Sequence, residues 1–153
     1  MHVPHFSFLL TKFGNILQQR MGIALRLLMV VGMLICLASA AHAAQGTATF
    51  YTAPYVPSSC YGYQDNGVMI AAASDAIWNN RGACGRRYRV RCIGATNQGV
   101  PQPCRGDGNG VVVKIVDYCP PGCQGTIDLS KEAFSKIANP DAGKIKIQYT
   151  LVS

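Results

Sequence analysis

Carboxylates and tyrosines are the side chains that could carry proton-transfer chemistry over most of this chain, because histidine is confined to its beginning. The three histidines are His2, His5 and His42. A Ser-His-Asp or Cys-His arrangement cannot be built beyond residue 42, since no histidine remains there to take the nucleophile's proton. A catalytic zinc site with histidine ligands is excluded for the same reason. The remaining acid–base candidates are the tyrosines and seven acidic residues: Asp65, Asp75, Asp107, Asp117, Asp128, Glu132 and Asp141.

Residues 1–43 have the three regions of a secretory signal peptide in the expected order. Basic residues come first, an uncharged apolar run over residues 27–37 follows, and small residues then end in Ala41-His42-Ala43. This order is typical of a signal that is cleaved after an A-x-A site. The run is shorter than the roughly 20 apolar residues of a membrane-spanning helix. We predict cleavage after Ala43 and no stable membrane insertion once the signal has been removed.

Removal of residues 1–43 leaves one predicted mature domain over residues 44–153. Met1 and Met21 are both plausible initiators, and either choice leaves this domain unchanged. Three of the 14 basic residues and none of the seven acidic residues leave with the signal, so the 110-residue domain has a net charge of +4. A chain of this length folds as a single domain. We expect it to be a monomer.

Six of the seven cysteines lie in the mature domain, because Cys36 leaves with the signal. They follow one another at intervals of 24, 8, 12, 15 and 4 residues: Cys60, Cys84, Cys92, Cys104, Cys119 and Cys123. An even number of cysteines in a small secreted domain is typical of disulfides, here three. The intervals lack the paired C-x2-C knuckles of a cysteine-only zinc site, so we expect no metal and no cofactor. Spacing alone leaves 15 disulfide pairings open.

Short strands and one helix must position these side chains. Strands are predicted from β-branched, alternating or apolar runs over residues 47–52, 68–73, 87–93, 111–116 and 145–151. The continuous apolar run over 111–116 predicts burial on both faces. Residues 126–129 lead into a helix, for which Ser130 is a favourable N-cap and Asn139-Pro140 an end. A turn or short helix remains open for residues 75–79, and a loop fixed by Cys60 is expected over residues 55–67.

A mainly β fold follows, with about six short strands and the helix between the last two. A closed barrel leaves no sheet edge unpaired. Three disulfides compensate for the small core of a domain of this size. The sequence therefore predicts a small barrel that is cross-linked by disulfides.

Three arginines alternate with apolar residues in the predicted strand over residues 87–93. Arg87, Arg89 and Arg91 face one side of this strand, and the apolar residues between them face the other. This basic face is either a solvated outer surface or a binding surface for an acidic partner such as pectin or anionic lipid. Nucleic acid is not an expected partner, because no aromatic residue on that face would stack on bases.

Four motifs occur in a fixed order along the mature domain. They are Thr49-Phe50-Tyr51, Arg81-Gly82-Ala83-Cys84-Gly85, Asp117-Tyr118-Cys119-Pro120-Pro121-Gly122-Cys123 and Asp128-Leu129-Ser130-x-x-Ala133-Phe134. Together with the cysteines and the signal, this set resembles the double-psi β-barrel of expansins and family-45 endoglucanases. It most resembles the single-domain plant natriuretic peptides and blight-associated proteins. The resemblance covers nearly all of residues 44–153, and it implies a six-stranded double-psi β-barrel with one short helix and the disulfides Cys60–Cys84, Cys92–Cys104 and Cys119–Cys123.

The resemblance also implies where a ligand cleft would lie. Inverting endoglucanases of this type use two carboxylates about 6.5–9.5 Å apart, one as the acid and one as the base. Asp128 occupies the place of the acid, although a carboxylate bonded to backbone at the helix start is the alternative interpretation. The place of the base, directly after Tyr51, holds no acidic residue, and Asp117 is the available substitute. The residues expected to line the cleft are Tyr51, Thr52, Asp117 and Asp128.

Two functions from different classes follow from these expectations. The first is a secreted, apoplastic, non-enzymatic protein that resembles plant natriuretic peptides and acts in signalling or at the cell wall, with a role in water and solute homeostasis. Its expected partner is a cell-surface receptor or an acidic wall polysaccharide. The alternative is a weak polysaccharide hydrolase or lytic enzyme with Asp128 as the acid, alone or with Asp117. The second, cellulose-gripping domain of expansins is not found in the chain, so wall loosening by the expansin route is not expected.

Overall fold

The computed structural model describes residues 22–23, 28, 43–97 and 99–153. The chain divides into two units, residues 1–40 and 41–153, and the second unit is described below. The candidate initiators Met1 and Met21 lie outside the described residues, and so does most of the predicted signal region. Among the residues that the structure describes, no helix has the length and apolar character needed to cross a membrane.

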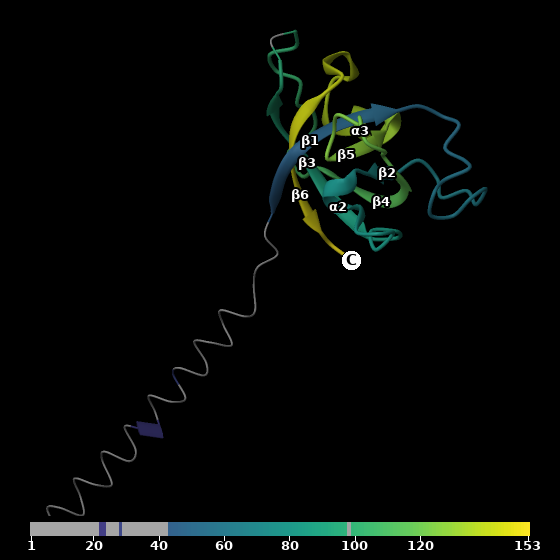
Figure 1. The fold of residues 1–153 in the computed structure, drawn as a ribbon. Coiled ribbons are helices and arrows are strands. Elements are labelled where there is room, and N and C mark those ends of the chain that lie inside the picture. The colour runs from purple at the N-terminus through teal and green to yellow at the C-terminus, as the bar shows by residue number, and fades with distance from the viewer. Residues whose placement is uncertain (1–21, 24–27, 29–42, 98) are drawn as a thin grey trace, which may run out of the picture. The chain divides into compact units, whose positions relative to one another are not determined.

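Six strands close into a barrel (Figure 1). They are β1 (Ala44–Tyr51), β2 (Ile70–Ala73), β3 (Arg87–Ala95), β4 (Val111–Tyr118), β5 (Ile127–Ser130) and β6 (Ile145–Leu151). Around the barrel the order is β1-β5-β2-β4-β3-β6. The pairs β1–β5 and β2–β4 are parallel, and the other four pairs are antiparallel. The predicted six-stranded barrel is therefore confirmed.

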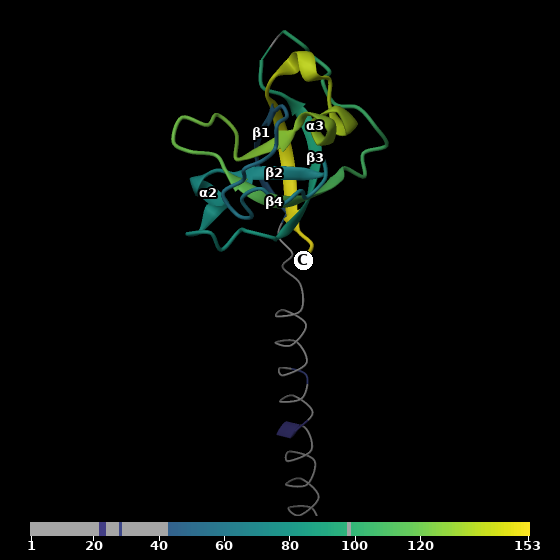
Figure 2. The ribbon, with the colours of Figure 1, turned by 90° about the vertical axis from the view of Figure 1, so that its right-hand side faces the viewer.

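Two short helices and a 3-10 turn complete the fold (Figure 2): α2 (Asp75–Trp78), α3 (Lys131–Ile137) and η1 (Pro140–Ala142). Ser130 caps α3 as predicted, because its hydroxyl accepts a hydrogen bond from the Ala133 N–H at 3.1 Å. The helix ends where the Ala138 N–H bonds to the Phe134 carbonyl. Because α3 packs against β1, β4 and β5, this cap also fixes the strand that carries Asp128.

The core fills the inside of the barrel with alternate residues of each strand. The inner residues include Ala48, Val90, Val113, Ile115, Ile127, Leu129, Ile145 and Ile147, all fully buried. Phe134 of α3 closes the core and packs on Phe50, with ring centroids 4.9 Å apart. Outward-facing side chains therefore lie at the positions between these residues, and these are the positions that can meet a ligand.

Several strands are longer than their local sequence patterns predict. β1 begins at Ala44, β3 continues to Ala95, and β4 includes Asp117 and Tyr118, which lie beyond the end of the predicted strand. The prediction that residues 111–116 are buried on both faces is wrong, because Val112 and Lys114 are only half-buried on the outer face. In a closed barrel only the inner face meets the core, whereas the outer face is covered only where loops lie on it.

The three expected disulfides are formed, and they join the pairs that the resemblance implies. Their Cα–Cα distances are 5.6 Å for Cys60–Cys84, 5.4 Å for Cys92–Cys104 and 5.7 Å for Cys119–Cys123. The first ties the loop after β1 to the segment before β3. The second ties β3 to the loop before β4, and the third closes the loop that follows β4.

Candidate functional site

Two carboxylates and two smaller side chains form a continuous row across four strands on the outside of the barrel. Thr49 of β1 lies opposite Asp128 of β5, and Asp128 lies opposite Ala72 of β2. Ala72 in turn lies opposite Asp117 of β4. We call Thr49, Asp128, Ala72 and Asp117 the acid row. Ala72 leaves space between the two acids, whose Cα atoms are two strand spacings, or about 9–10 Å, apart.

A β-bulge places Asp117 in this row. The register between β2 and β4 shifts so that Ala71 pairs with Ile115 but Ala72 pairs with Asp117, which leaves Val116 as the extra residue. Strict alternation would have put Asp117 on the same face as Ile115, which lies inside the barrel. The bulge reverses the direction of the residue that follows it and turns Asp117 outward.

Asp128 is half-buried and is held by a side chain from another strand. The Thr49 hydroxyl donates a hydrogen bond of 2.7 Å to Asp128 Oδ1. Burial raises the pKa of the Asp128 carboxyl above its ordinary value, and the hydrogen bond from Thr49 opposes part of that rise. The alternative interpretation, a carboxylate bonded to backbone at the helix start, is not what the structure shows, because Ser130 has that position. Asp128 is therefore a carboxyl group suited to hold a proton at higher pH than an exposed aspartate.

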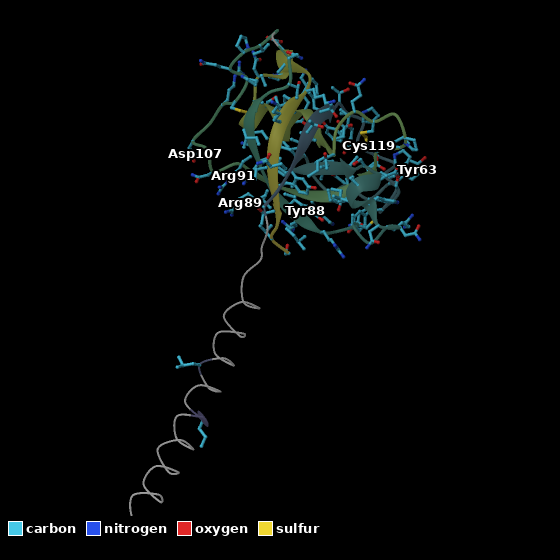
Figure 3. The ribbon with its side chains drawn as sticks, turned by 60° about the vertical axis from the view of Figure 1, so that its left-hand side comes forward. Tyr63, Tyr88, Arg89, Arg91, Asp107 and Cys119 are labelled. Carbon is cyan, nitrogen blue, oxygen red and sulfur yellow. A yellow bond between two sulfur atoms is a disulfide. The ribbon has the colours of Figure 1, made fainter. Side chains whose placement is uncertain are left out.

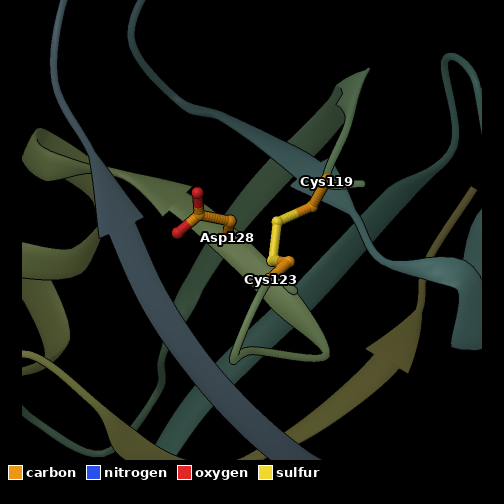
Figure 4. Close-up of side chains that lie close together, drawn as sticks. All are labelled: Cys119, Cys123 and Asp128. Atoms are coloured by element: carbon orange, nitrogen blue, oxygen red, sulfur yellow. A yellow bond between two sulfur atoms is a disulfide. The ribbon is translucent and has the colours of Figure 1, made fainter. Parts of the chain in front are cut away.

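The loop after β4 packs closely against this pair. A Cβ atom on Gly125 would lie 2.9 Å from Thr49 Oγ1 and 3.0 Å from the Thr49 backbone N, so the close approach requires glycine. Figure 4 shows Asp128 beside the Cys119–Cys123 disulfide, and one donor atom from each of these three residues lies within 4.8 Å of the others. Disulfide-bonded sulfurs offer no thiolate to a metal ion. The disulfide instead restrains the loop that leads to Gly125.

Asp117 is held by the loop that follows β1. Its Oδ1 atom accepts hydrogen bonds from the backbone N–H groups of Ser59 and Tyr118, both at 2.8 Å, and from the Ser59 hydroxyl. Cys60, next to Ser59, also joins its N–H to the Val116 carbonyl and its sulfur to Cys84. These bonds fix the position of one carboxylate oxygen and leave the other free of protein donors among the described residues.

Tyr51 contributes an unpaired hydroxyl near both acids. It follows Thr49 by two residues on β1 and so faces the same side. Its buried hydroxyl has no hydrogen-bond partner among the described residues. Burial raises the pKa of Tyr51, and the negative charges of Asp117 and Asp128 raise it further. The side chain therefore remains a neutral donor that a ligand oxygen could satisfy.

Thr52, which was predicted to line the cleft, and Tyr55, which was not, lie near Tyr51. Thr52 lies directly after β1 and is exposed. The ring of Tyr55 meets that of Tyr51 edge-on, with centroids 5.2 Å apart, and the Tyr55 hydroxyl donates to Glu132. This hydrogen bond lowers the pKa of Glu132. Sequence reasoning did not assign Thr49 or Tyr55 to the site, because their partners lie 77 or more residues away in sequence.

A polar cavity of about 310 Å³ lies beside the loop after β4. Its lining comes mainly from residues 119–126, with Thr47 and residues 74–76 on the other side. Close to it, the Tyr118 ring lies on the half-buried Trp78, with centroids 5.0 Å apart, and the Tyr118 hydroxyl donates to Asp75. Trp78 also packs against the core.

The predicted basic face lies on β3. The expected alternation is present, because Tyr88 and Val90 are buried whereas Arg87 and Arg89 are exposed and Arg91 is half-buried. Figure 3 shows Arg89 and Arg91 on the opposite side of the molecule from Cys119. β3 is flanked by β4 and β6 in the closed barrel. The basic face and the acid row are therefore separate surfaces.

The chain is similar to a known protein family and to several known proteins. The family model described as lytic transglycolase matches residues 70–149. The chain is 65% identical over 130 residues to an EG45-like domain containing protein of Citrus jambhiri, which covers 84% of this chain and 98% of the relative. It is 48% identical over 114 residues to EG45-like domain containing protein 2 of Arabidopsis thaliana, which covers 74% of this chain and 85% of the relative.

Two solved structures share the fold. The apo structure of an expansin from Clavibacter michiganensis is similar with a TM-score of 0.53 and 26% identity. A mutant of that expansin in complex with cellohexaose is similar with a TM-score of 0.52 and 25% identity. Each comparison covers 71% of this chain and 50% of the expansin chain, so the protein spans half of the expansin's length.

Proposed function

Since the chain belongs to the EG45-like domain containing proteins, within the expansin-like double-psi β-barrel group, we propose that it is a secreted, cell-wall-associated protein. In this proposal it binds a neutral β-glucan along the acid row and does not cleave it efficiently. The observation that carries the proposal is the pair of outward-facing acids on either side of the small Ala72. A cellohexaose complex of a structurally similar expansin supports a β-glucan as the ligand class.

The side chains of the acid row suit a sugar chain. Carboxylate oxygens of Asp117 and Asp128 can accept hydrogen bonds from sugar hydroxyls, and the Tyr51 hydroxyl can donate one. Because Tyr51 lacks a protein partner among the described residues, a ligand oxygen would relieve the cost of a buried, unpaired hydroxyl. The row is also held rigidly by Thr49 and Ser59, which lowers the ordering cost of binding.

Weak or absent cleavage follows from the missing base. An inverting hydrolase needs a carboxylate that activates water as well as an acid that protonates the leaving group. The segment after Tyr51, Thr52-Ala53-Pro54, contains no acidic residue. Asp117 is the remaining carboxylate, and three donors on its Oδ1 stabilise it as a fixed acceptor.

One observation favours a hydrolase or lytic enzyme as the second candidate function. Asp128 has the raised pKa of a general acid, and its Cα lies about 9–10 Å from that of Asp117 by strand spacing. Carboxyl groups about 6.5–9.5 Å apart are the arrangement of inverting glycosidases. Asp117 could then serve as the base through its free oxygen.

A single experiment separates the two candidates. The secreted protein is titrated calorimetrically with cellohexaose and is then incubated with it while reducing ends or unsaturated ends are counted. We expect binding without repeated turnover, and we expect Asp128→Asn to weaken the binding by about tenfold, as for loss of a charged hydrogen bond. Asp141→Asn is the matched control, because Asp141 is exposed on η1 and is not part of the row. Repeated turnover that Asp128→Asn abolishes and Asp141→Asn preserves would establish the enzyme instead.

The resemblance to plant natriuretic peptides extends this proposal to signalling. In that case the protein acts in the apoplast on water and solute balance through a cell-surface receptor, as a monomer of residues 44–153. N-terminal sequencing of the protein secreted from the full coding sequence should begin at Ala44 or within about two residues of it. A protein that is retained in the membrane with residues 1–43 attached would contradict the proposed domain organisation.

A further inference from the structure

The outer face of β3 and β6 forms a second candidate binding site, separate from the acid row. In this antiparallel pair, Arg89 lies opposite Thr150, and Arg91 lies opposite Gln148. Cross-strand partners share a face and have Cβ atoms about 4.5–5.5 Å apart. The two arginines and the two polar side chains therefore form one outward-facing patch.

In the uncleaved chain a pocket of about 200 Å³ opens at this patch, with Ala43 and Val152 as its remaining walls. Cleavage after Ala43 removes that wall and leaves the two arginines, Gln148, Thr150 and Val152 as the lining. None of the described residues that line it is acidic. The nearby Asp107 is already bonded within its own turn, since its carboxylate accepts hydrogen bonds from the backbone and side-chain N–H groups of Asn109. The Arg91 guanidinium makes a long hydrogen bond of 3.4 Å to the Asn109 carbonyl. The pocket thus holds two cationic side chains with no carboxylate in its lining.

The chemistry of the lining fits a sugar acid. An arginine guanidinium is planar and pairs with a carboxylate through two parallel hydrogen bonds. Gln148 and Thr150 can donate to and accept from hydroxyl groups, and Val152 offers an apolar wall to the C–H face of a ring. The volume with Ala43 in place is below the roughly 300–1,000 Å³ of sites for drug-sized ligands, and the five lining side chains that remain without Ala43 suit a single ring.

We propose that Arg89 and Arg91, with Gln148 and Thr150, bind a hexuronate unit of an acidic polysaccharide. This proposal rests on the extracellular location proposed above but not on the acid row. In this proposal only Arg89 and Arg91 of the basic face contact the ligand. Arg87 lies opposite Lys114 on β4 and does not line the pocket. Arg87 therefore adds to the local positive charge without contacting the ligand.

A membrane surface would be the other source of anionic groups. Segments that bind anionic lipid through charge present about four to eight basic side chains on a flat or helical surface. Here two arginines line a concave pocket, which favours one ring with one carboxylate over a sheet of headgroups.

The test uses the protein secreted from its full coding sequence and trigalacturonate as the probe in calorimetric titrations. We expect Arg89→Gln and Arg91→Gln each to weaken binding by about tenfold, the effect of one charge-assisted hydrogen bond. Arg105→Gln, which removes the same charge from an exposed loop, should leave binding unchanged. Arg89→Lys should recover only part of the affinity, because an ammonium group cannot form the bidentate pair.

Several results would overturn the proposal. They are equal losses for Arg105→Gln and Arg89→Gln, equal binding of methyl-esterified trigalacturonate, and binding to vesicles of anionic phospholipid without binding to trigalacturonate. Cellohexaose titrated into the same proteins reports on the acid row alone. A parent protein that binds trigalacturonate but not cellohexaose shows that the acid-row proposal fails, and one that binds cellohexaose but not trigalacturonate shows that the pocket proposal fails.

Discussion

The acid row and the basic face occupy different sides of one barrel and are positioned in different ways. The acid row crosses β1, β5, β2 and β4, and its two acids are half-buried and bonded to Thr49 and Ser59, 79 and 58 residues away in sequence. The basic face lies on β3 and is completed by β6. Alternation along one strand is enough to set the direction of Arg89 and Arg91.

The two surfaces should therefore respond differently to substitution. Side chains of the acid row contribute to folding and to binding together, because their hydrogen bonds join distant segments. Arginines of the basic face contribute to binding through charge, and exposed charges add little to the free energy of unfolding. Substitutions should therefore affect stability on one side of the barrel and leave it nearly unchanged on the other.

The largest expected effect comes from the disulfides. Cys60–Cys84 joins residues 24 apart and Cys92–Cys104 joins residues 12 apart. The chain-entropy relation predicts that their removal costs about 3.5 and about 3 kcal/mol of unfolding free energy. Urea unfolding of the two double alanine variants measures these losses.

Removal of the two disulfides should differ more in its effect on ligand binding than in its effect on the free energy of unfolding. Cys60 adjoins Ser59, which holds Asp117, whereas Arg89 and Arg91 are held by the β3–β6 ladder. We expect the Cys60→Ala/Cys84→Ala variant to lose cellohexaose binding. The Cys92→Ala/Cys104→Ala variant should keep trigalacturonate binding, and equal loss of both ligands in both variants would contradict the comparison.

A matched pair of threonines gives the next largest effect. Thr49→Val removes the hydroxyl that donates to Asp128 and leaves a half-buried carboxylate without that partner, at a cost of about 1–3 kcal/mol. Thr150→Val makes the same change on the outer face of β6, where we expect a change within about 0.5 kcal/mol. Urea unfolding at neutral pH measures both. Equal losses would show that the acid row is no more integrated into the fold than the basic face.

The smallest effect is the pH dependence that Asp128 contributes. Its folded-state pKa is raised, so its contribution to stability is present in full below the ordinary pKa of an aspartate and is lost as pH rises through the raised pKa. Asparagine has no carboxyl group to ionise, so the Asp128→Asn variant does not lose stability in this way as pH rises. Thr49 can still donate a hydrogen bond to the amide oxygen. The variant should therefore gain stability relative to the parent at neutral pH but not at about pH 3, below both pKa values.

Unfolding curves at the two pH values check this prediction. Asp141→Asn is again the control, because Asp141 is exposed on η1. A gain that is equal at both pH values, or equal in the two variants, would show that burial of Asp128 is not its cause.

Much of the fold could be predicted because its signals are local. β6 matches the predicted strand residue for residue, and Ser130 caps α3 as predicted. Strand ends were less predictable, since β1 and β3 extend as far as a neighbouring strand continues to pair with them. Asp128 and Asp117 were identified as candidates from motifs, but their common row was not.

The chemistry that is available, carboxylates and tyrosines without histidine after residue 42, can be read from the amino-acid sequence, and so can the alternation that points Arg89 and Arg91 outward. The hydrogen bond from Thr49 to Asp128 and the bulge that turns Asp117 to the same outer face are seen only in the folded barrel. Strand register between distant segments depends on the whole barrel. A shift of one residue reverses every side chain that follows it, and no local periodicity records that shift.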